Sequence, residues 1–239
     1  LALEQAAPGL GFDARRRFRK AAYWMPLPPS YADYLAARSS KFRNYARRAE
    51  KKLRACGSLE VVEVTCPEAF PNGFAALLEI ERDSWKHTHG TAISAQPQQA
   101  AFYRAWGEEM AAGGTLHLQL LLLEGRPIAH NLGCIHRGTY YYLKTSYSAE
   151  YRPQSPATFL RLHLIERLIS RRLRSIDFCG TPYEWEQQWT SEHRWHHVLS
   201  IYADTWRGRV LARLDRWTHY SATGDTVVHG DPRKERSSD

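Results

Sequence analysis

Residues 139 to 189 read TYYYLKTSYSAEYRPQSPATFLRLHLIERLISRRLRSIDFCGTPYEWEQQW, and this stretch decides the fold. An aromatic strand, 139–147, is followed by a polar loop that ends in Gln154, Ser155 and Pro156. Ser155 is a preferred N-cap residue, and Pro156 suits the first helical position, where its missing N–H is not needed. The pattern therefore predicts a helix that begins at Pro156.

The predicted helix carries an apolar stripe that indicates a sheet beneath it. Leu162, Ile165, Ile169 and Leu173 recur at spacings of three and four residues. A strand that leads through a short loop into such a helix leaves free N–H groups and a partial positive charge at the helix start. Phosphate binds well at such places, although an ordinary capped helix without a ligand fits the same pattern.

Composition indicates a globular protein without a membrane span. The chain has 239 residues, of which 43% are hydrophobic, so it is long enough to bury a core. Its longest apolar run, Leu116–Leu123, has only the length of a strand. The four cysteines lie far apart without a Cys-x-x-Cys pair, which favours a reducing, cytoplasmic setting: Cys56, Cys66, Cys134 and Cys179.

Positive charge is concentrated in one segment. The formal net charge is +8, and seven of the 14 residues from Lys41 to Arg54 are Lys or Arg. We expect a surface helix here, with Phe42 and Leu53 on its apolar face. Because a basic face attracts nucleic acid, acidic membranes and phosphorylated cofactors alike, the charge does not choose among them.

Histidine spacing does not indicate a metal site. His87 and His89, and the later group His193, His196 and His197, match none of the common zinc patterns. No Gly-x-Ser-x-Gly motif is present either, which disfavours a Ser-His-Asp hydrolase. We therefore expect no metal.

Periodicity predicts an α/β (α+β) fold with a mixed central sheet, an antiparallel meander and helices on both faces. The expected helices are 31–38, 40–56, 73–85, 98–112, a segment from 156, one near 183–189 and one from 209. The expected strands are 59–65, 115–123, 127–136, 139–147, 175–178 and 198–204, of which 115–147 form the meander.

Three parts of the chain are expected. Residues 1–29 are rich in Gly, Pro and Arg, which predicts an extended linker. They could equally be the remnant of a missing N-terminal half, because helical material begins abruptly after their arginine cluster. Residues 30–220 form the main domain, and residues 221–239 form a flexible tail.

Several short motifs, in this order, resemble those of GNAT-fold acyltransferases. They are Tyr147-x3-Tyr151-x3-Ser155-Pro156, then Asp177-Phe178-x-Gly180-x2-Tyr183, and Trp189. Together with the upstream runs at 24–28 and 41–57, they look most like the cellulose-biosynthesis CelD-like branch, which is related to the Fem-type transferases. The resemblance covers roughly residues 22–205.

Three positions depart from the family pattern. Ala157 stands where the family usually has Gly and where backbone must approach a pyrophosphate closely. Ser148 replaces a common acidic residue, and Glu184 replaces a frequent basic one. The last two differences weaken any transfer of substrate class.

The resemblance implies that acetyl-CoA or another acyl-CoA is the co-substrate. It places the pantetheine arm along Leu143, Lys144 and Thr145. The resemblance assigns the diphosphate to residues of the loop and first helical turn: Gln154, Ser155, Pro156, Ala157 and Thr158. Arg152 could add a charged contact to phosphate, although a solvated loop arginine is an equal alternative.

Catalytic and acceptor residues follow from the same resemblance. Asp177, at a predicted strand end, is the candidate general base, although a turn cap is an equal alternative. Tyr147 and Tyr183 are candidate proton donors to the leaving thiolate, and Trp85 and Tyr151 are candidates for the acceptor pocket. For the tyrosines and the tryptophan, simple packing is the competing interpretation.

Three functions remain open at this point. The first is transfer of an acyl group from acyl-CoA to an amine or hydroxyl of a small molecule or saccharide. The resemblance implies that the acyl group is acetyl and that the reaction belongs to polysaccharide or envelope metabolism. The second is a Fem-like aminoacyl-tRNA-dependent transferase, in which the basic segment 41–54 contacts tRNA. The third is a GNAT-like binding module without catalysis. The resemblance also implies an earlier, degenerate GNAT-like half.

Overall fold

A computed structural model describes residues 5–88, 90–180 and 184–218. It divides the chain into two compact units, which are treated separately below. The larger unit is Trp24–Cys179, and the smaller unit combines the chain before residue 24 with the chain after residue 179.

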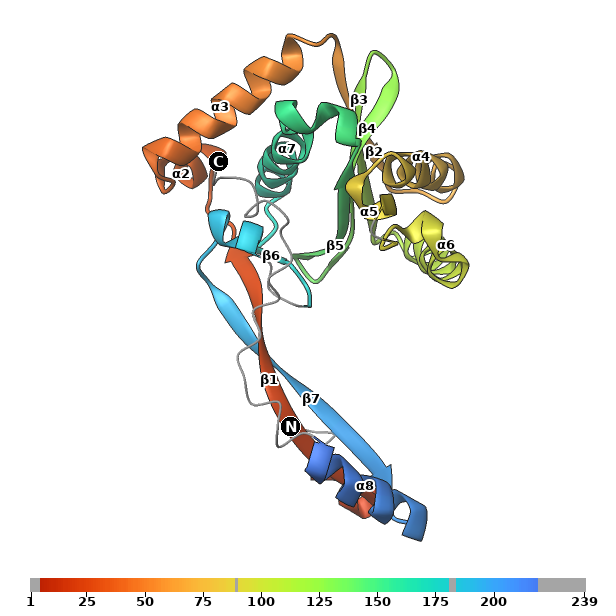
Figure 1. Cartoon of the computed structure of the whole chain (residues 1–239). Helices are drawn as coiled ribbons and strands as arrows, with labels where there is room; N and C mark the ends of the chain where they lie inside the picture. Colours follow the sequence, from red (N-terminus) through yellow and green to blue (C-terminus); the bar gives the residue numbers. More distant parts are fainter. Residues whose placement is uncertain (1–4, 89, 181–183, 219–239) are drawn as a thin grey trace, which may run out of the picture. The chain divides into compact units, whose positions relative to one another are not determined.

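The larger unit is built on one mixed sheet (Figure 1). Its strand order is β2-β3-β4-β5-β6-β1, and every neighbouring pair is antiparallel except β5 and β6, which are parallel. The strands are β1 (Phe12–Pro26, with only its last three residues in this unit), β2 (Leu59–Val64), β3 (Leu116–Leu123), β4 (Arg126–His136), β5 (Thr139–Tyr147) and β6 (Ser175–Asp177).

Helices cover both faces of this sheet (Figure 1). One face carries α4 (Phe70–Arg82), α5 (Trp85–Thr88), the 3-10 turn η2 (Ile93–Ala95) and α6 (Pro97–Ala112). The other face carries α7 (Pro156–Ser170), on which α2 (Tyr31–Ala36) and α3 (Ser40–Arg54) pack. The predicted α/β class with a mixed sheet, a meander and helices on both faces is confirmed.

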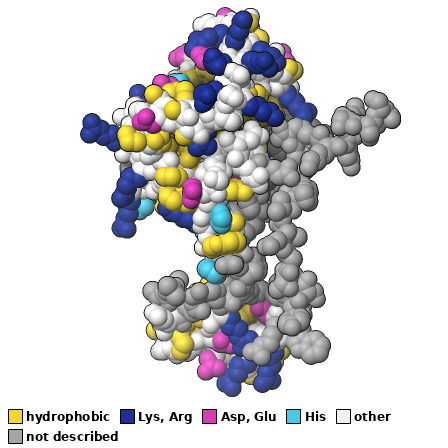
Figure 2. Space-filling model, turned by 90° about the vertical axis from the view of Figure 1, so that its left-hand side faces the viewer, with side chains coloured by type: hydrophobic (Ala, Val, Ile, Leu, Met, Phe, Trp, Pro, Cys, Tyr) yellow, Lys and Arg dark blue, Asp and Glu magenta, His cyan; other side chains and the backbone are white. Residues whose placement is uncertain are grey.

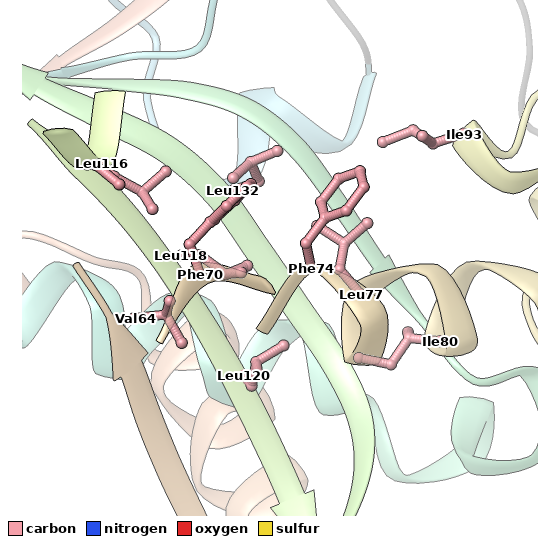
Figure 3. Close-up of a cluster of buried hydrophobic side chains, with 11 residues drawn as sticks. Val64, Phe70, Phe74, Leu77, Ile80, Ile93, Leu116, Leu118, Leu120 and Leu132 are labelled. Atoms are coloured by element: carbon pink, nitrogen blue, oxygen red, sulfur yellow. The ribbon is translucent and has the colours of Figure 1, made fainter. Parts of the chain in front are cut away.

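The main core lies between α4 and the meander (Figure 3). Phe70, Phe74, Leu77 and Ile80 recur at helical spacing and point toward leucines of β3 and β4. Each is at most 1% exposed, and full burial of such a side chain stabilises the fold by about 1.5–3 kcal/mol. This packing fixes α4, and therefore the polar residues at its C-terminal end, against the sheet.

The smaller unit contains a two-stranded ribbon. β1 pairs antiparallel with β7 (His193–Ala203), from Phe12↔Ala203 to Tyr23↔His193. The unit also holds η1 (Pro8–Leu10), η4 (Glu184–Gln188) and α8 (Trp206–Thr218). Residues 12–26 are thus a paired strand where an unpaired linker was expected, because the arginine-rich run has no alternation and its pairing is with residues far along the chain.

Two further differences concern the same unit. The helix expected near 183–189 is a 3-10 turn over its described residues, and β7 begins five residues before the expected strand. The expected tail 221–239 lies outside the described residues. The domain limits 30 and 220 stay a prediction.

No helix in the described part of the chain combines the length and the apolar character that crossing a bilayer requires.

Candidate functional site

β5 is paired along only one of its edges for most of its length. It pairs with β4 along the whole strand, but its pairing with β6 covers residues 139–141 alone. From 142 to 147 the second edge has no strand partner among the described residues. Such an edge offers backbone N–H and C=O groups to an extended ligand. Leu143, Lys144 and Thr145, predicted to bind the cofactor, lie on this open edge.

A β-bulge lies within the open edge. Leu132 pairs with Lys144 and Gly133 pairs with Tyr142, so Leu143 is an extra residue of β5. A bulge bends a strand and redirects its backbone groups. A Cβ at position 133 would lie 2.3 Å from a β5 carbonyl oxygen. The two strands can approach this closely only because residue 133 is glycine.

The loop after β5 ends in a left-handed residue. It contains η3 (Ala149–Gln154), and α7 begins at Pro156 as predicted. Ser155 has φ 57° and ψ 52°, and its side chain makes no capping hydrogen bond. The predicted side-chain N-cap is therefore wrong, because capping requires an extended backbone at that residue. The Ser155 carbonyl instead accepts the N–H groups of Thr158 (3.0 Å) and Phe159 (3.3 Å).

A buried polar network joins β5 to α7. The Tyr142 hydroxyl donates to Asn131 Oδ1 at 2.6 Å, and the Thr145 hydroxyl donates to the same oxygen at 3.1 Å. Arg161 of α7 donates to the Tyr142 hydroxyl through Nη2 at 3.2 Å. Because Asn131, Tyr142 and Arg161 are buried and linked by hydrogen bonds, they hold α7 in a fixed position beside the open edge.

The opposite face of the sheet holds a buried ionic cluster, formed by Glu81, Lys86 and His130, which the sequence analysis did not identify. The Glu81 and His130 side chains are 0% exposed. Lys86 Nζ lies 3.2 Å from Glu81 Oε1, and His130 Nε2 lies 3.5 Å from the same oxygen. The Ile93 N–H donates to the other carboxylate oxygen. The cluster reaches β5, since Lys86 Nζ also donates to the Thr145 carbonyl at 2.6 Å.

The cluster perturbs the pKa of each member. Burial alone would raise the pKa of Glu81, but the His130 imidazole, the Lys86 charge and the Ile93 N–H lower it to about 2. Burial lowers the pKa of Lys86, against the opposing pull of Glu81. Burial likewise lowers the pKa of His130, which favours the neutral imidazole. Perturbed ionisable groups beside an open strand edge are typical of functional sites.

A pattern in the sequence points to this cluster. Glu81 follows Phe74 and Leu77 at helical spacing, so it continues the apolar stripe of α4. His130 lies two residues before Leu132, which belongs to the α4 core, so the two share a face of β4. A charged or polar residue on a buried face is the informative exception to hydrophobic patterning.

Asp177 lies where β5 and β6 separate. It pairs in register with Tyr141, the last β5 residue that β6 contacts. Its Oδ1 accepts the Cys179 N–H at 2.9 Å, so it closes a turn at the end of β6. Burial, and then the Asp177 charge, raise the pKa of the Cys179 thiol to about 12. That thiol is therefore a poor nucleophile at neutral pH.

The structure describes the positions of some of the remaining predicted residues but not of all. Tyr147 and Tyr151 are partly buried and pack against the apolar cluster that contains Leu53. Arg152 is exposed on the loop. Trp85 begins α5, but its side chain lies outside the description, and Tyr183 lies outside the described residues.

Metal ligands do not gather in the part of the chain that the structure describes: no three His, Cys, Asp or Glu side chains there could hold an ion together.

Comparison with known proteins gives a family match. Residues 40–187 match the family described as an acetyltransferase (GNAT) domain. That span is more than half of the chain, and it includes the open edge, the loop, α7 and the Glu81 cluster. No curated protein matches the sequence.

Solved structures share the fold at low sequence identity. FemX is 14% identical with a TM-score of 0.51, and the match covers 89% of this chain and 70% of FemX. L-PGS from Bacillus licheniformis is 11% identical with a TM-score of 0.51, covering 90% and 69%. The DUF2156 C-terminal domain of an Agrobacterium fabrum protein, assigned as a lysylphosphatidylglycerol synthetase, is 14% identical with a TM-score of 0.51, covering 91% and 69%. At these identities the likeness concerns the fold alone.

Proposed function

The chain belongs to the acetyltransferase (GNAT) domain family, and on that premise we propose that it transfers an acyl group, in the first instance acetyl, from acyl-CoA to an amine or hydroxyl acceptor. One observation carries the proposal: β5 loses its β6 partner at residue 142 and then leads through η3 to the start of α7. A strand edge and an adjoining helix start suit the two parts of coenzyme A, because one binds amides and the other binds phosphates.

The proposed binding mode follows the order of the chain. The pantetheine arm extends along Leu143–Thr145, and the diphosphate lies against the loop and first turn from Gln154 to Thr158. Arg152 adds a charge-assisted hydrogen bond to phosphate. The methyl group of Ala157 is compatible with this mode if the phosphate stands slightly farther from the backbone than it would from glycine.

The proposed reaction is a direct transfer. The acceptor nitrogen or oxygen attacks the thioester carbonyl carbon, the carbonyl oxygen becomes negative, and the intermediate then expels the coenzyme thiolate. Asp177 is proposed to take the acceptor proton, and Tyr147 or Tyr183 to donate a proton to the thiolate. The position of Asp177 beside the last paired residue of β5 supports this role.

The acceptor is proposed from the resemblance to the CelD-like branch. It is a small molecule or saccharide of polysaccharide or envelope metabolism, transformed in the cytoplasm, with Trp85 and Tyr151 beside it. The hydrogen bond from Lys86 to the Thr145 carbonyl supports a structural role for the Glu81 cluster, which would hold the strand along which the thioester lies.

Thermal unfolding with and without acetyl-CoA tests the proposal. At a free concentration of 100 times Kd, a ligand that binds only the folded state stabilises it by about 2.7 kcal/mol. That corresponds to a rise in Tm of roughly 5–10 °C for a domain of this size. If neither short-chain nor long-chain acyl-CoA raises the Tm, the proposed function is wrong.

A second candidate is an aminoacyl-tRNA-dependent transferase of the Fem type. The observation that favours it is the exposed basic side of α3, together with the likeness of fold to FemX. tRNA binding of this kind would weaken steeply with salt and be lost when Arg47, Arg48, Lys51 and Lys52 are neutralised. Binding that is absent or insensitive to salt would dismiss this candidate.

A further inference from the structure

One flank of α3 carries a line of three cations and a tyrosine. Lys41, Tyr45, Arg48 and Lys52 are separated by four, three and four residues, so they form one row along the helix. α3 buries Ala46, Ala49 and Leu53, and the α3 row (Lys41, Tyr45, Arg48 and Lys52) lies at one border of that buried stripe. Figure 2, which faces the side formed by α2 and α3, shows Lys and Arg gathered where α3 runs in Figure 1.

Two members of the α3 row contact the β5–α7 connection. The Tyr45 hydroxyl and Thr158 Oγ1 are 3.1 Å apart, which joins the row to the first turn of α7. Lys52 Nζ lies 3.5 Å from the Pro153 carbonyl oxygen, which joins it to η3. Arg48 lies between Tyr45 and Lys52 in the row, on the same flank of α3.

The cations of this row are not neutralised by protein groups. In the described part of the chain, Lys41 and Arg48 have neither an ion pair nor a hydrogen bond, and both are exposed. Among the other α3 cations, Arg47 donates to Asn44 and Arg54 donates to Glu50, whereas Lys51 also has no ion pair or hydrogen bond in the described part of the chain. In η3 itself, the acidic Glu150 is paired with Arg126 at 3.2 Å. Its charge is thereby offset.

The first turn of α7 needs such charges if it is to bind phosphate. Pro156 has no N–H, and the N–H groups of Thr158 and Phe159 already donate to the Ser155 carbonyl. The turn contains no Lys or Arg of its own. Fewer free backbone N–H donors remain here than at a helix N-terminus whose first N–H groups are all unbonded. Side-chain cations are therefore more important for binding an anion.

We propose that Lys41, Arg48 and Lys52 of the α3 row are the side-chain half of the phosphate site and bind the phosphate groups of acyl-CoA at the β5–α7 loop. This inference rests on the proposed function and adds to it a helix that lies outside the strand, loop and helix start described above. Two parts of the coenzyme carry phosphate and could bind the row: the diphosphate and the 3′-phosphate.

A pair of matched double variants tests the inference by isothermal titration calorimetry with acetyl-CoA. R48A/K52A removes two cations of the row, whereas R47A/K51A removes one Arg and one Lys from the side of α3 that faces away from α7. Two lost charge-assisted contacts predict about a 10- to 100-fold rise in Kd for R48A/K52A. R47A/K51A is expected to change Kd by less than about threefold, since exposed charges act weakly at a distance in salt.

Two further measurements check that the variants fold and identify which phosphate the row binds. R48A alone removes no hydrogen bond or ion pair among the described residues, so it must retain the wild-type Tm and still weaken binding several-fold. Dephospho-CoA distinguishes the two phosphates. If the wild-type preference for CoA over dephospho-CoA disappears in R48A/K52A, the row binds the 3′-phosphate; if the preference persists while both ligands weaken, the row binds the diphosphate.

Two results would overturn the inference while leaving the proposed function in place. One is an equal change of Kd in the two double variants, which would mean that the row attracts the ligand only through non-specific electrostatics. The other is unchanged acetyl-CoA binding with a loss of tRNA binding in R48A/K52A. If the wild-type protein binds no acyl-CoA at all, the inference fails together with the proposed function.

Discussion

The Glu81 carboxylate is a charged group in a fully buried position. It lies at 0% exposure between Lys86 and His130, and it accepts the Ile93 N–H. Removal of one partner from a buried ion pair leaves the other charge uncompensated. The carboxylate therefore holds α4, α5 and β4 together beside the Thr145 carbonyl.

Replacement of this carboxylate should cost stability in a pH-dependent way. Glu81→Gln is expected to lower the free energy of unfolding by about 3–5 kcal/mol at pH 7. The folded pKa of about 2 is below the ordinary value of 4.5, so the stabilisation is full above about pH 4.5 and is lost as pH falls toward 2. Urea unfolding should accordingly show the gap between wild type and variant narrowing from pH 6 to pH 3.

Glu79→Gln is the matched control for that experiment. Glu79 lies on the exposed side of the same helix, and its replacement should change stability by less than about 0.5 kcal/mol. A gap that stays constant with pH in Glu81→Gln would contradict the assigned charge state.

Asp177 has two possible roles that one substitution separates. Asp177→Asn keeps a side-chain oxygen for the Cys179 N–H but cannot accept a proton. We expect kcat to fall by about 10²–10⁴ while Tm and the KM for acyl-CoA stay near their wild-type values. An unchanged kcat in steady-state assays would assign Asp177 to the turn alone.

Among elements, α7 shows how much local sequence can predict. Its first residue was predicted correctly, because proline at the first position and the apolar stripe are both local signals. The left-handed backbone of Ser155 was not predicted, because it depends on the direction in which η3 enters the helix. β1 escaped prediction for a similar reason, since it pairs with residues 175–177 and 193–203, far along the chain.

Two serines at helix starts should respond oppositely to glycine. Ser155 is left-handed and does not cap, so Ser155→Gly should relieve backbone strain and raise stability by about 0.5–1 kcal/mol. Ser30 is extended, and its side chain accepts the Asp33 N–H at 3.0 Å. Ser30→Gly should instead cost a few tenths of a kcal/mol. Thermal unfolding of both variants checks the signs, and a loss of stability in Ser155→Gly would contradict the left-handed assignment.

At the scale of the whole molecule, the sheet order separates what the sequence could predict from what it could not. The class, the meander and the helices on both faces follow from periodicity and are confirmed. The cofactor edge was predicted only through resemblance, because periodicity does not say where β5 loses its partner. The Glu81 cluster could not be assembled beforehand, since it joins residues 49 positions apart, Glu81 and His130.

The central claim is that the open edge of β5 binds the arm of acyl-CoA, and amide hydrogen exchange with and without acetyl-CoA tests it most directly. The outer edge of β2 is the internal control, because β2 is also an edge strand and, among the described strands, pairs with β3 alone. We predict that acetyl-CoA slows exchange in residues 142–147 and 154–158 and leaves 59–64 unchanged. Protection that is absent from 142–147, or equal in the two edges, would contradict the account.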